Sequence, residues 1–137
     1  YVKPTAQPSV APESKKTGDR LALKVMQGKE YGKVYDLNEE VRRCGRRMLT
    51  VGRELTNSIP IDDYYESYMS RKHCTIECIG PVSWQIRDGQ WDPDSMIWKN
   101  SMNGTYVNSD LVGNTGKILN NGDIITIGDV KLKFDIY

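Results

Sequence analysis

Residues 123–136 read DIITIGDVKLKFDI, and this stretch decides the fold class. Gly128-Asp129 is a two-residue hairpin signal between two apolar runs. In the second run, apolar and charged residues alternate: Val130, Leu132, Phe134 and Ile136 against Lys131, Lys133 and Asp135. A period of two is typical of a strand that is buried on one face only. The stretch therefore predicts a β-hairpin.

Short apolar or alternating runs recur from Leu21 onward, separated by Gly, Pro, Asn and Asp. The other runs are Leu21–Met26, Lys33–Leu37, Met48–Val51, Ile59–Ile61, Lys72–Ile79, Ser83–Arg87, Met96–Trp98, Thr105–Val107 and Gly116–Leu119. No longer stretch keeps the 3.6-residue period of an amphipathic helix. The nearest candidate, Leu37–Arg47, is interrupted by Gly45 and mostly charged, so no helix is expected there. The pattern predicts an all-β sandwich or barrel over residues 21–137.

Length and composition are typical of a single globular domain, with 137 residues, 38% hydrophobic and 27% charged. Residues 1–20 contain Pro4, Pro8 and Pro12 and few apolar side chains, so we expect a flexible N-terminal linker there. The net charge of +1 lacks the basic excess of a nucleic-acid-binding surface. We find neither a signal peptide nor an apolar run long enough to span a membrane. Because the first residue is Tyr1 rather than Met, we expect a piece of a longer protein.

The three cysteines, Cys44, Cys74 and Cys78, do not have the spacing of a disulfide framework. This usage favours a reducing compartment, so we expect an intracellular protein, cytoplasmic or nuclear. Cys74 and Cys78 fall on one face of the expected strand at 72–79, and we expect them to pack in the core. One histidine and scattered cysteines are a poor ligand supply for zinc, so neither a metal nor a cofactor is expected.

Three short motifs bring anion-binding groups to the ends of the expected strands. Gly52-Arg53 follows the run Met48–Val51, and a guanidinium offers a planar set of donors to phosphate or carboxylate. Ser70-Arg71-Lys72-His73 offers a hydroxyl and two cations. Asn103-Gly104-Thr105 is a turn signal whose Asn amide both donates and accepts. Each motif alone is also consistent with an ordinary solvated turn.

No catalytic set accompanies these motifs. His73 has no partner that would orient it as a general acid or base, so a structural role is expected. We therefore do not expect this domain to be an enzyme, although a longer parent protein can carry a kinase or phosphatase domain. The motifs favour a module that holds a phosphorylated partner without changing it chemically.

In this order, the motifs resemble those of the forkhead-associated (FHA) domain. That family has Gly-Arg, then Ser-x-x-His, then Ser-x-Asn-Gly-Thr, then Gly-Asp before an apolar strand that ends in an Ile-Gly turn. The matching residues are Gly52-Arg53, Ser70-x-x-His73, Ser101-x-Asn103-Gly104-Thr105, Asn121-Gly122-Asp123 and Ile127-Gly128. Any one motif is common, whereas all five in order are specific. The resemblance covers residues 21–137 and implies an eleven-stranded antiparallel β-sandwich whose loops at one end bind phosphothreonine in an extended peptide.

The resemblance also implies roles for the matching residues. The phosphopeptide contacts would be Arg53, Ser70 and Arg71 at the phosphate and Asn103 at the peptide backbone. Support of the binding loops would come from Gly52, His73, Gly104 and Thr105. Sequence preference would come from the variable positions Tyr68, Met102, Gly128 and Asp129. The expected partner is a threonine-phosphorylated protein, bound by a monomeric domain of a larger signalling protein.

Two features depart from the family pattern. Residues 87–100, with Trp91 and Trp98, separate the strand before them from Ser101, and Trp98-Lys99-Asn100 replaces the acidic residue that often precedes this serine. This insertion is expected to reshape the ligand surface or to extend a hairpin. The second departure is a set of arginines expected to form a basic loop, solvated rather than a second site for an acidic partner: Arg42, Arg43, Arg46 and Arg47.

Three other functions stay open at this point. An FHA-fold scaffold that binds its partner without phosphate is the main alternative, although the presence of Arg53, Ser70 and Asn103 argues against it. An enzyme would need a catalytic set that these residues do not provide. Nucleic-acid binding through Arg42–Arg47 would give affinity for any polyanion, falling steeply with salt.

Overall fold

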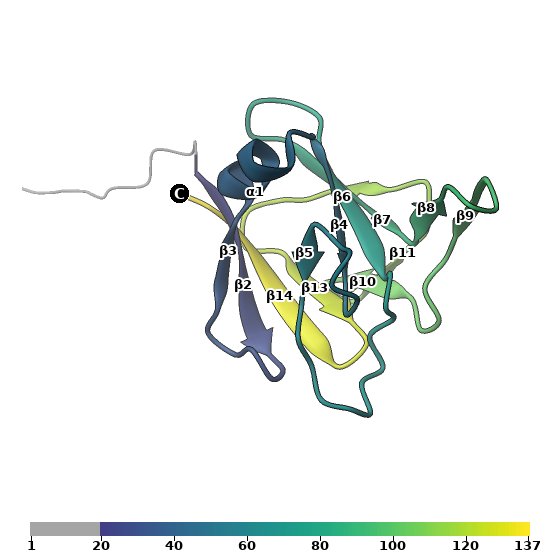
Figure 1. Ribbon diagram of the computed structural model, residues 1–137. Coiled ribbons are helices and arrows are strands. Elements are labelled where there is room, and N and C mark those ends of the chain that lie inside the picture. Colours follow the sequence, from purple (N-terminus) through teal and green to yellow (C-terminus); the bar gives the residue numbers. More distant parts are fainter. Residues whose placement is uncertain (1–19) are drawn as a thin grey trace, which may run out of the picture.

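The computed structural model describes residues 20–137 (Figure 1). Two β-sheets packed face to face form the body of the structure, which confirms the all-β sandwich. The expected linker at residues 1–20 lies almost entirely outside the described residues.

Within residues 20–137, the larger sheet has six strands in the order β11-β10-β13-β14-β2-β3. Their bounds are β2 Leu21–Gln27, β3 Val34–Asp36, β10 Thr105–Val107, β11 Asp110–Val112, β13 Ile124–Ile127 and β14 Val130–Ile136. The second sheet has five strands in the order β12-β7-β6-β4-β5. Their bounds are β4 Met48–Gly52, β5 Ile59–Pro60, β6 Cys74–Cys78, β7 Trp84–Asp88 and β12 Lys117–Ile118. The two sheets together match the expected eleven strands, although β4 and β5 pair in parallel.

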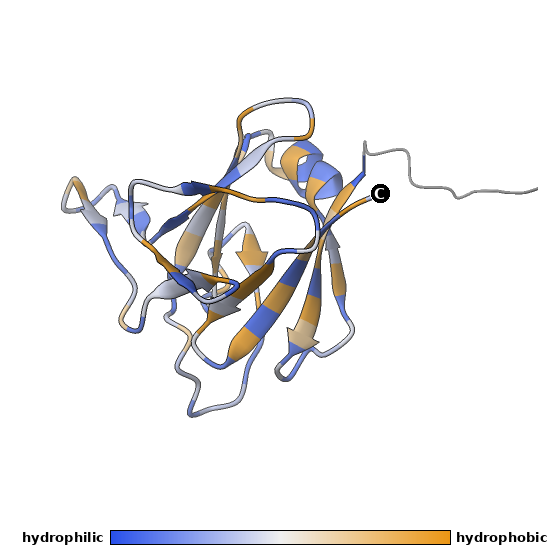
Figure 2. Ribbon diagram, turned by 180° about the vertical axis from the view of Figure 1, so that it is seen from behind, coloured by the Kyte–Doolittle hydropathy of each residue, from blue (hydrophilic) through white to orange (hydrophobic). Residues whose placement is uncertain are grey.

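The β13–β14 hairpin has the register that the sequence indicates, with Ile127 opposite Val130 across the Gly128-Asp129 turn. The apolar side chains of β14 at Val130, Leu132 and Phe134 are buried between the sheets. Figure 2 shows the resulting alternation of hydrophobic and hydrophilic residues along this part of the sheet. Each fully buried side chain of this size stabilises the fold by about 1.5–3 kcal/mol, so the alternation fixes which face of β14 points inward.

The core also contains Cys74 and Ile76 of β6, and Cys78 packs against it half-buried, as expected. Burial raises the pKa of the Cys74 thiol well above its usual range. All three cysteines are free thiols.

One helix, α1 (Leu37–Cys44), contradicts the expectation that Leu37–Arg47 is not helical. The Asp36 carboxylate caps its start by accepting from the N–H of Glu39 at 3.1 Å. Gly45, in the left-handed region at φ 68°, ends it by donating to the carbonyl of Val41 at 2.9 Å. The glycine that interrupts the pattern is therefore the helix C-cap.

The basic loop expected at Arg42–Arg47 is also wrong in part. Arg42 and Arg43 lie on α1 and form ion pairs with Glu39 and Glu40, one turn earlier. The side chain of Arg47 donates to the carbonyl of Cys78 at 3.3 Å. Two of the four arginines are therefore paired with carboxylates of the same helix.

The insertion at residues 87–100 forms a separate two-stranded hairpin, β8 (Gln90–Asp92) and β9 (Ile97–Lys99), at the right in Figure 1. β8 and β11 are the two strands that the sequence runs do not include. Among residues 20–137, no helix has the length and apolar character needed to cross a membrane.

Candidate functional site

A groove of about 880 Å³ opens between the loops at one end of the sandwich and the β8–β9 hairpin. Its walls come from the start of the β4–β5 loop, the end of the β5–β6 loop, the hairpin and the turn before β10. The predicted ligand-contact and specificity residues that line it are Arg53, Tyr68, Ser70, Arg71, Met102 and Asn103. The structure thus brings together groups that are far apart in the sequence, from Arg53 to Asn103.

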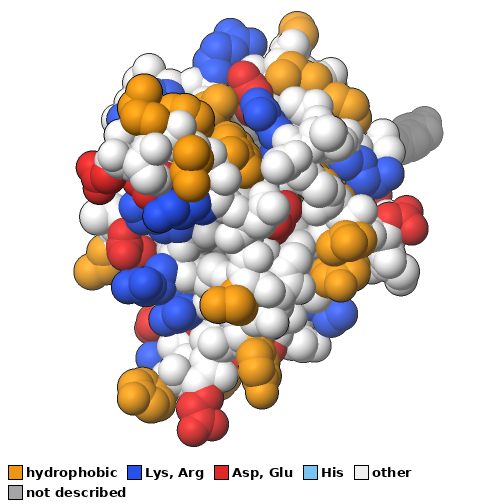
Figure 3. All heavy atoms as spheres, turned by 90° about the vertical axis from the view of Figure 1, so that its right-hand side faces the viewer, with side chains coloured by type: hydrophobic (Ala, Val, Ile, Leu, Met, Phe, Trp, Pro, Cys, Tyr) orange, Lys and Arg blue, Asp and Glu red, His pale blue; other side chains and the backbone are white. Residues whose placement is uncertain are grey.

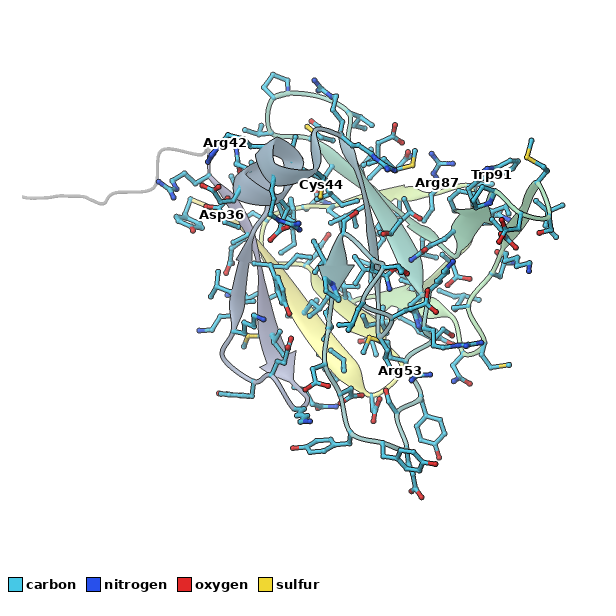
Figure 4. The ribbon with its side chains drawn as sticks, viewed as in Figure 1. Asp36, Arg42, Cys44, Arg53, Arg87 and Trp91 are labelled. Carbon is cyan, nitrogen blue, oxygen red and sulfur yellow. The ribbon has the colours of Figure 1, made fainter. Side chains whose placement is uncertain are left out.

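Arg53 follows β4 and is tied to the β5–β6 loop by two contacts. Its backbone N–H donates to the carbonyl of Ser70 at 3.3 Å, and its Nε donates to the carbonyl of Met69. Both Nη groups have no hydrogen-bond partner within residues 20–137. A guanidinium has five N–H donors, so the group is held in place while most of its donors stay available. Figure 4 shows Arg53 at the loop end of the sandwich.

Ser70 and Asn103 join the two loops that face each other across this end. The Ser70 hydroxyl oxygen accepts from the N–H of Met102 at 3.0 Å, which leaves its own proton free to donate. The Asn103 Nδ2 donates to the carbonyl of Tyr68 at 2.9 Å, and its Oδ1 stays available as an acceptor. Both side chains are therefore oriented before any ligand is present.

The charges in the groove divide into paired and unpaired groups. The Lys72 Nζ lies 3.8 Å from Glu54 Oε1, and the Lys99 Nζ lies 2.8 Å from Asp92 Oδ2. Arg53 and Arg71 form no ion pair within the described part of the chain. The two arginines without an ion pair therefore lie next to Ser70, and the nearby Glu54 carboxylate interacts electrostatically with Arg71.

His73 sits behind the groove rather than in it, fully buried. Its Nδ1 accepts from the N–H of Ser70 at 2.9 Å, and its Nε2 donates to the carbonyl of Gly104 at 2.8 Å. This pair of contacts requires the neutral tautomer with the proton on Nε2. Burial lowers the pKa of His73, partly opposed by the Gly104 contact and by the charge of Asp88. Because the backbone occupies both ring nitrogens, the side chain links the two loops and has no nitrogen free for proton transfer.

Two glycines allow the loops to approach one another. A Cβ at Gly52 would lie 2.2 Å from the carbonyl oxygen of Arg71, a distance that no side chain tolerates. Gly104 has φ +86°, which places the turn before β10 in a region that L-residues rarely adopt. Thr105, directly after this turn, is fully buried.

Asp88 is a supporting residue that the sequence reasoning missed. Its carboxylate accepts from the N–H and the hydroxyl of Ser101 at 3.2 and 2.6 Å, and from the hydroxyl of Thr105 at 2.7 Å. It therefore fixes the turn that presents Asn103. The sequence has Trp98-Lys99-Asn100 where the family often has an acidic residue before this serine. In the folded chain Asp88 contacts Ser101 nevertheless, because the hairpin loops out the residues between them.

A buried amide pair, Asn57 and Gln90, was also missed. The Gln90 Nε2 donates to Asn57 Oδ1 at 2.8 Å and to the carbonyl of Val51 at 3.1 Å. The Asn57 Nδ2 in turn donates to the carbonyl of Arg71 at 2.8 Å. This network connects the base of the hairpin to the loop that carries Ser70 and Arg71.

Gly128 and Asp129 do not line the groove. The Asp129 Oδ1 accepts from the N–H of Tyr68 at 3.2 Å and from the hydroxyl of Ser67 at 3.3 Å, and Gly128 lies against the backbone of Tyr68 and Met69. The β13–β14 turn therefore contacts the β5–β6 loop from outside the groove. No group of three or more His, Cys, Asp or Glu residues within residues 20–137 is placed to hold a metal ion.

Several solved structures share this fold. An FHA domain from a study of phosphothreonine-dependent FHA interactions aligns with a TM-score of 0.63 at 23% identity, covering 86% of this chain and 97% of that one. The FHA domain of a hypothetical protein from Arabidopsis thaliana gives 0.64 at 25% identity, covering 90% and 91%. EmbR of Mycobacterium tuberculosis, in complex with a low-affinity phosphopeptide, gives 0.61 at 25% identity, covering 85% of this chain and 24% of that one.

At the level of sequence, a comparison with curated proteins finds no match. The sequence model of the FHA domain matches residues 49–128, a span that runs from β4 to the Gly128 turn and contains all five motifs. By sequence motifs, by sandwich topology and by this match, the chain belongs to the FHA domain family.

Proposed function

We propose that this FHA domain binds phosphothreonine-containing segments of a partner protein and catalyses no reaction on them. The observation that carries the proposal is the presence of two arginines that form no ion pair, Arg53 and Arg71, beside the oriented hydroxyl of Ser70. A phosphate group carries about −1.5 to −2 charge and three acceptor oxygens near neutral pH. Charge-assisted hydrogen bonds from guanidinium groups are the strong contacts that such a ligand makes.

The three groups have separate tasks in this proposal. The Nη groups of Arg53 and the guanidinium of Arg71 neutralise the phosphate, and the Ser70 hydroxyl donates to one of its oxygens. Because Arg53 is already held by the carbonyl of Met69, little side-chain freedom is lost when the phosphate binds.

Asn103 recognises the main chain of the ligand. Its amide is held by the carbonyl of Tyr68, and its free Oδ1 accepts an N–H of an extended peptide. Recognition of one phosphate and of adjacent backbone suits a linear segment rather than a folded surface. The preference for threonine over serine rests on the family and on the neighbour studied for phosphothreonine-dependent interactions.

We also propose that the domain acts as a monomeric module of a larger intracellular signalling protein, cytoplasmic or nuclear. The support for a reducing compartment is that Cys44, Cys74 and Cys78 are free thiols. Cys74 is buried, and no disulfide staples the fold within residues 20–137.

The test begins with an oriented phosphothreonine peptide library, from which the preferred peptide is selected. Fluorescence-polarisation titrations then compare this peptide with its phosphoserine and unphosphorylated versions. Arg53→Ala should weaken binding at least tenfold, since a hydrogen bond to a charged group contributes about 1.5–3 kcal/mol. Arg46→Ala is the matched control, because Arg46 is exposed and lies outside the groove.

Equal affinity for the unphosphorylated peptide would replace this proposal with the phosphate-independent scaffold. Unchanged binding by Arg53→Ala would remove Arg53 from the site. Comparable affinity for single-stranded DNA, lost at moderate salt, would indicate a general polyanion surface instead.

A further inference from the structure

We propose that the β8–β9 hairpin forms a second subsite in the same groove, where Lys99 selects an anionic side chain that flanks the phosphothreonine. The inference rests on the proposed function and adds a specificity-determining residue to it. The anion is a carboxylate or a second phosphate, which share the chemistry that an ammonium group recognises.

The hairpin is a fixed wall of the groove, held at its base on both strands. On β8, the buried Gln90 is hydrogen-bonded to Asn57 beneath the loops. On β9, the Trp98 Nε1 donates to the carbonyl of Asp88 at 2.7 Å, and the guanidinium of Arg87 lies 5.1 Å from the centre of the Trp98 ring. A charged group on this hairpin is therefore presented in a defined place.

In the ion pair between Lys99 and Asp92, the lysine can still bind a ligand, whereas the carboxylate is largely occupied. The carboxylate of Asp92 is mostly covered, and it accepts from Lys99, from the hydroxyl of Ser95 at 2.8 Å and from the N–H of Asp94 at 3.0 Å. The side chain of Lys99 is 59% exposed and lines the groove. An ammonium has three donors, and Asp92 takes one of them. The pair therefore offers hydrogen-bond donors to a ligand and no comparable acceptor.

The subsite is separate from the phosphate cluster. Lys99 lies on β9, opposite Gln90 of β8, whereas Arg53, Ser70 and Arg71 lie on the β4–β5 and β5–β6 loops. In Figure 4, Trp91 of the hairpin and Arg53 lie on different parts of the molecule. On the face seen in Figure 3, Lys and Arg side chains occur at several separate places instead of in a single cluster. Because an extended peptide advances about 3.3 Å per residue, Lys99 meets a residue other than the phosphothreonine.

The experiment uses fluorescein-labelled peptides with one phosphothreonine in a neutral Ala/Ser background. Asp, phosphoserine, Lys or Ala is placed in turn at each flanking position. Wild type should prefer Asp or phosphoserine over Ala at one or more positions on one side, by about two- to fivefold, the size typical of an exposed ion pair. Comparison of the Asp and phosphoserine arms identifies which anion is preferred.

Substitutions at two positions test the assignment, and they should change the anion preference in opposite directions. Lys99→Ala and Lys99→Gln should remove the anion preference and leave binding of the neutral phosphothreonine peptide unchanged. Asp92→Asn should strengthen the anion preference, because Lys99 loses its competing carboxylate while the single amide oxygen of Asn can still accept from the N–H of Asp94. Lys24→Ala, a change of the same charge on β2 outside the groove, should have no effect.

Three results would overturn the inference. One is the absence of any anion preference in wild type, with phosphothreonine binding intact. Another is weaker anion preference in both the Lys99 and Asp92 variants, which would make the pair a purely structural contact. The third is equal loss for neutral and anionic peptides in Lys99→Gln, which would place Lys99 at the phosphate itself. Failure of every phosphopeptide to bind wild type would instead refute the proposed function.

Discussion

The two walls of the groove are held by different kinds of contact. The loop wall, residues 61–73 and 101–104, is fixed by buried polar side chains that rise from the sheets, above all His73 and Asp88. The hairpin wall, residues 89–100, is fixed only at its base, by Gln90 and Trp98. Damage to the loop wall should therefore reduce both folding stability and phosphate binding, whereas damage to the hairpin wall should cost less folding stability and change ligand preference without changing phosphate binding.

The largest expected effect comes from His73→Ala. The substitution leaves the Ser70 N–H and the Gly104 carbonyl without partners and empties a buried volume, so we expect a loss of about 3 kcal/mol in the free energy of unfolding. Urea denaturation of both proteins measures this loss. A variant that keeps wild-type stability but fails to bind would place His73 in the contact surface, and the loop wall would then not be braced as described.

Asp88→Asn should come next. An amide has one acceptor oxygen and no charge, so at least one of the contacts to Ser101 and Thr105 is lost, at about 2 kcal/mol in unfolding free energy. Phosphopeptide affinity should fall too, since the turn that presents Asn103 is released. Asp110→Asn, an exposed carboxylate on β11, is the matched control for thermal melts and titrations. Normal affinity together with reduced stability would uncouple the turn from the site.

Trp98→Phe probes the hairpin wall and should have a smaller effect. The substitution removes the hydrogen bond to the Asp88 carbonyl and keeps a ring beside Arg87. We therefore expect a loss of about 1 kcal/mol in the free energy of unfolding. Preference for flanking residues should weaken, while affinity for a neutral phosphothreonine peptide stays the same. An equal loss for both kinds of peptide would show that the two walls act as one unit.

Folding stability should also depend weakly on pH through His73. The pKa of this residue is below 6.5 in the folded protein because of burial, whereas the unfolded chain titrates near 6.5. Below that pH the unfolded state binds more protons, so stability falls as pH falls from 7 toward 5.5. His73→Gln should flatten this part of the stability profile. An unchanged slope in the variant would assign the dependence to other groups.

Peptide affinity should fall over the same range for a different reason. The phosphate loses its second charge below about pH 6, whereas the arginines stay protonated. Titrations of wild type at pH 7 and 5.5 measure the change. Rising affinity at the lower pH would mean that a protonated His73 faces the ligand.

Features coded by neighbouring residues were predictable from the sequence. The β13–β14 hairpin follows from alternation, and the groove positions of Arg53, Ser70 and Asn103 follow from motifs at strand ends. The helix α1 had readable signals as well, an Asp36 cap three residues before Glu39 and a closing Gly45. Its eight residues are too few for a helical period to stand out in the sequence. Gly45 therefore looks like a break in the pattern when it is the C-cap of a short helix.

Features that depend on residues distant in the sequence were not predictable. Nothing in the spacing of Asp88 and Ser101 shows that they touch, because the hairpin lies between them. The same holds for Gln90, whose polar side chain at the start of an insertion gives no indication of burial beneath another loop. The family resemblance places Asp129 among the specificity positions, and only the folded chain shows that its carboxylate accepts from the N–H of Tyr68 outside the groove.

The short distance between Asp88 Oδ2 and Ser101 N, 3.2 Å, means that the chain leaves and re-enters the sandwich at nearly one point. Closing a longer loop across such a junction costs little extra free energy, because loop entropy grows only with the logarithm of length. Residues 91–97 lie between Gln90 and Trp98, the two residues whose side chains anchor the hairpin. We therefore expect that this segment can be replaced without disturbing the sandwich. Grafting other hairpin tips at this junction would yield a set of phosphopeptide reagents that share one phosphate grip and differ in the sequences they capture.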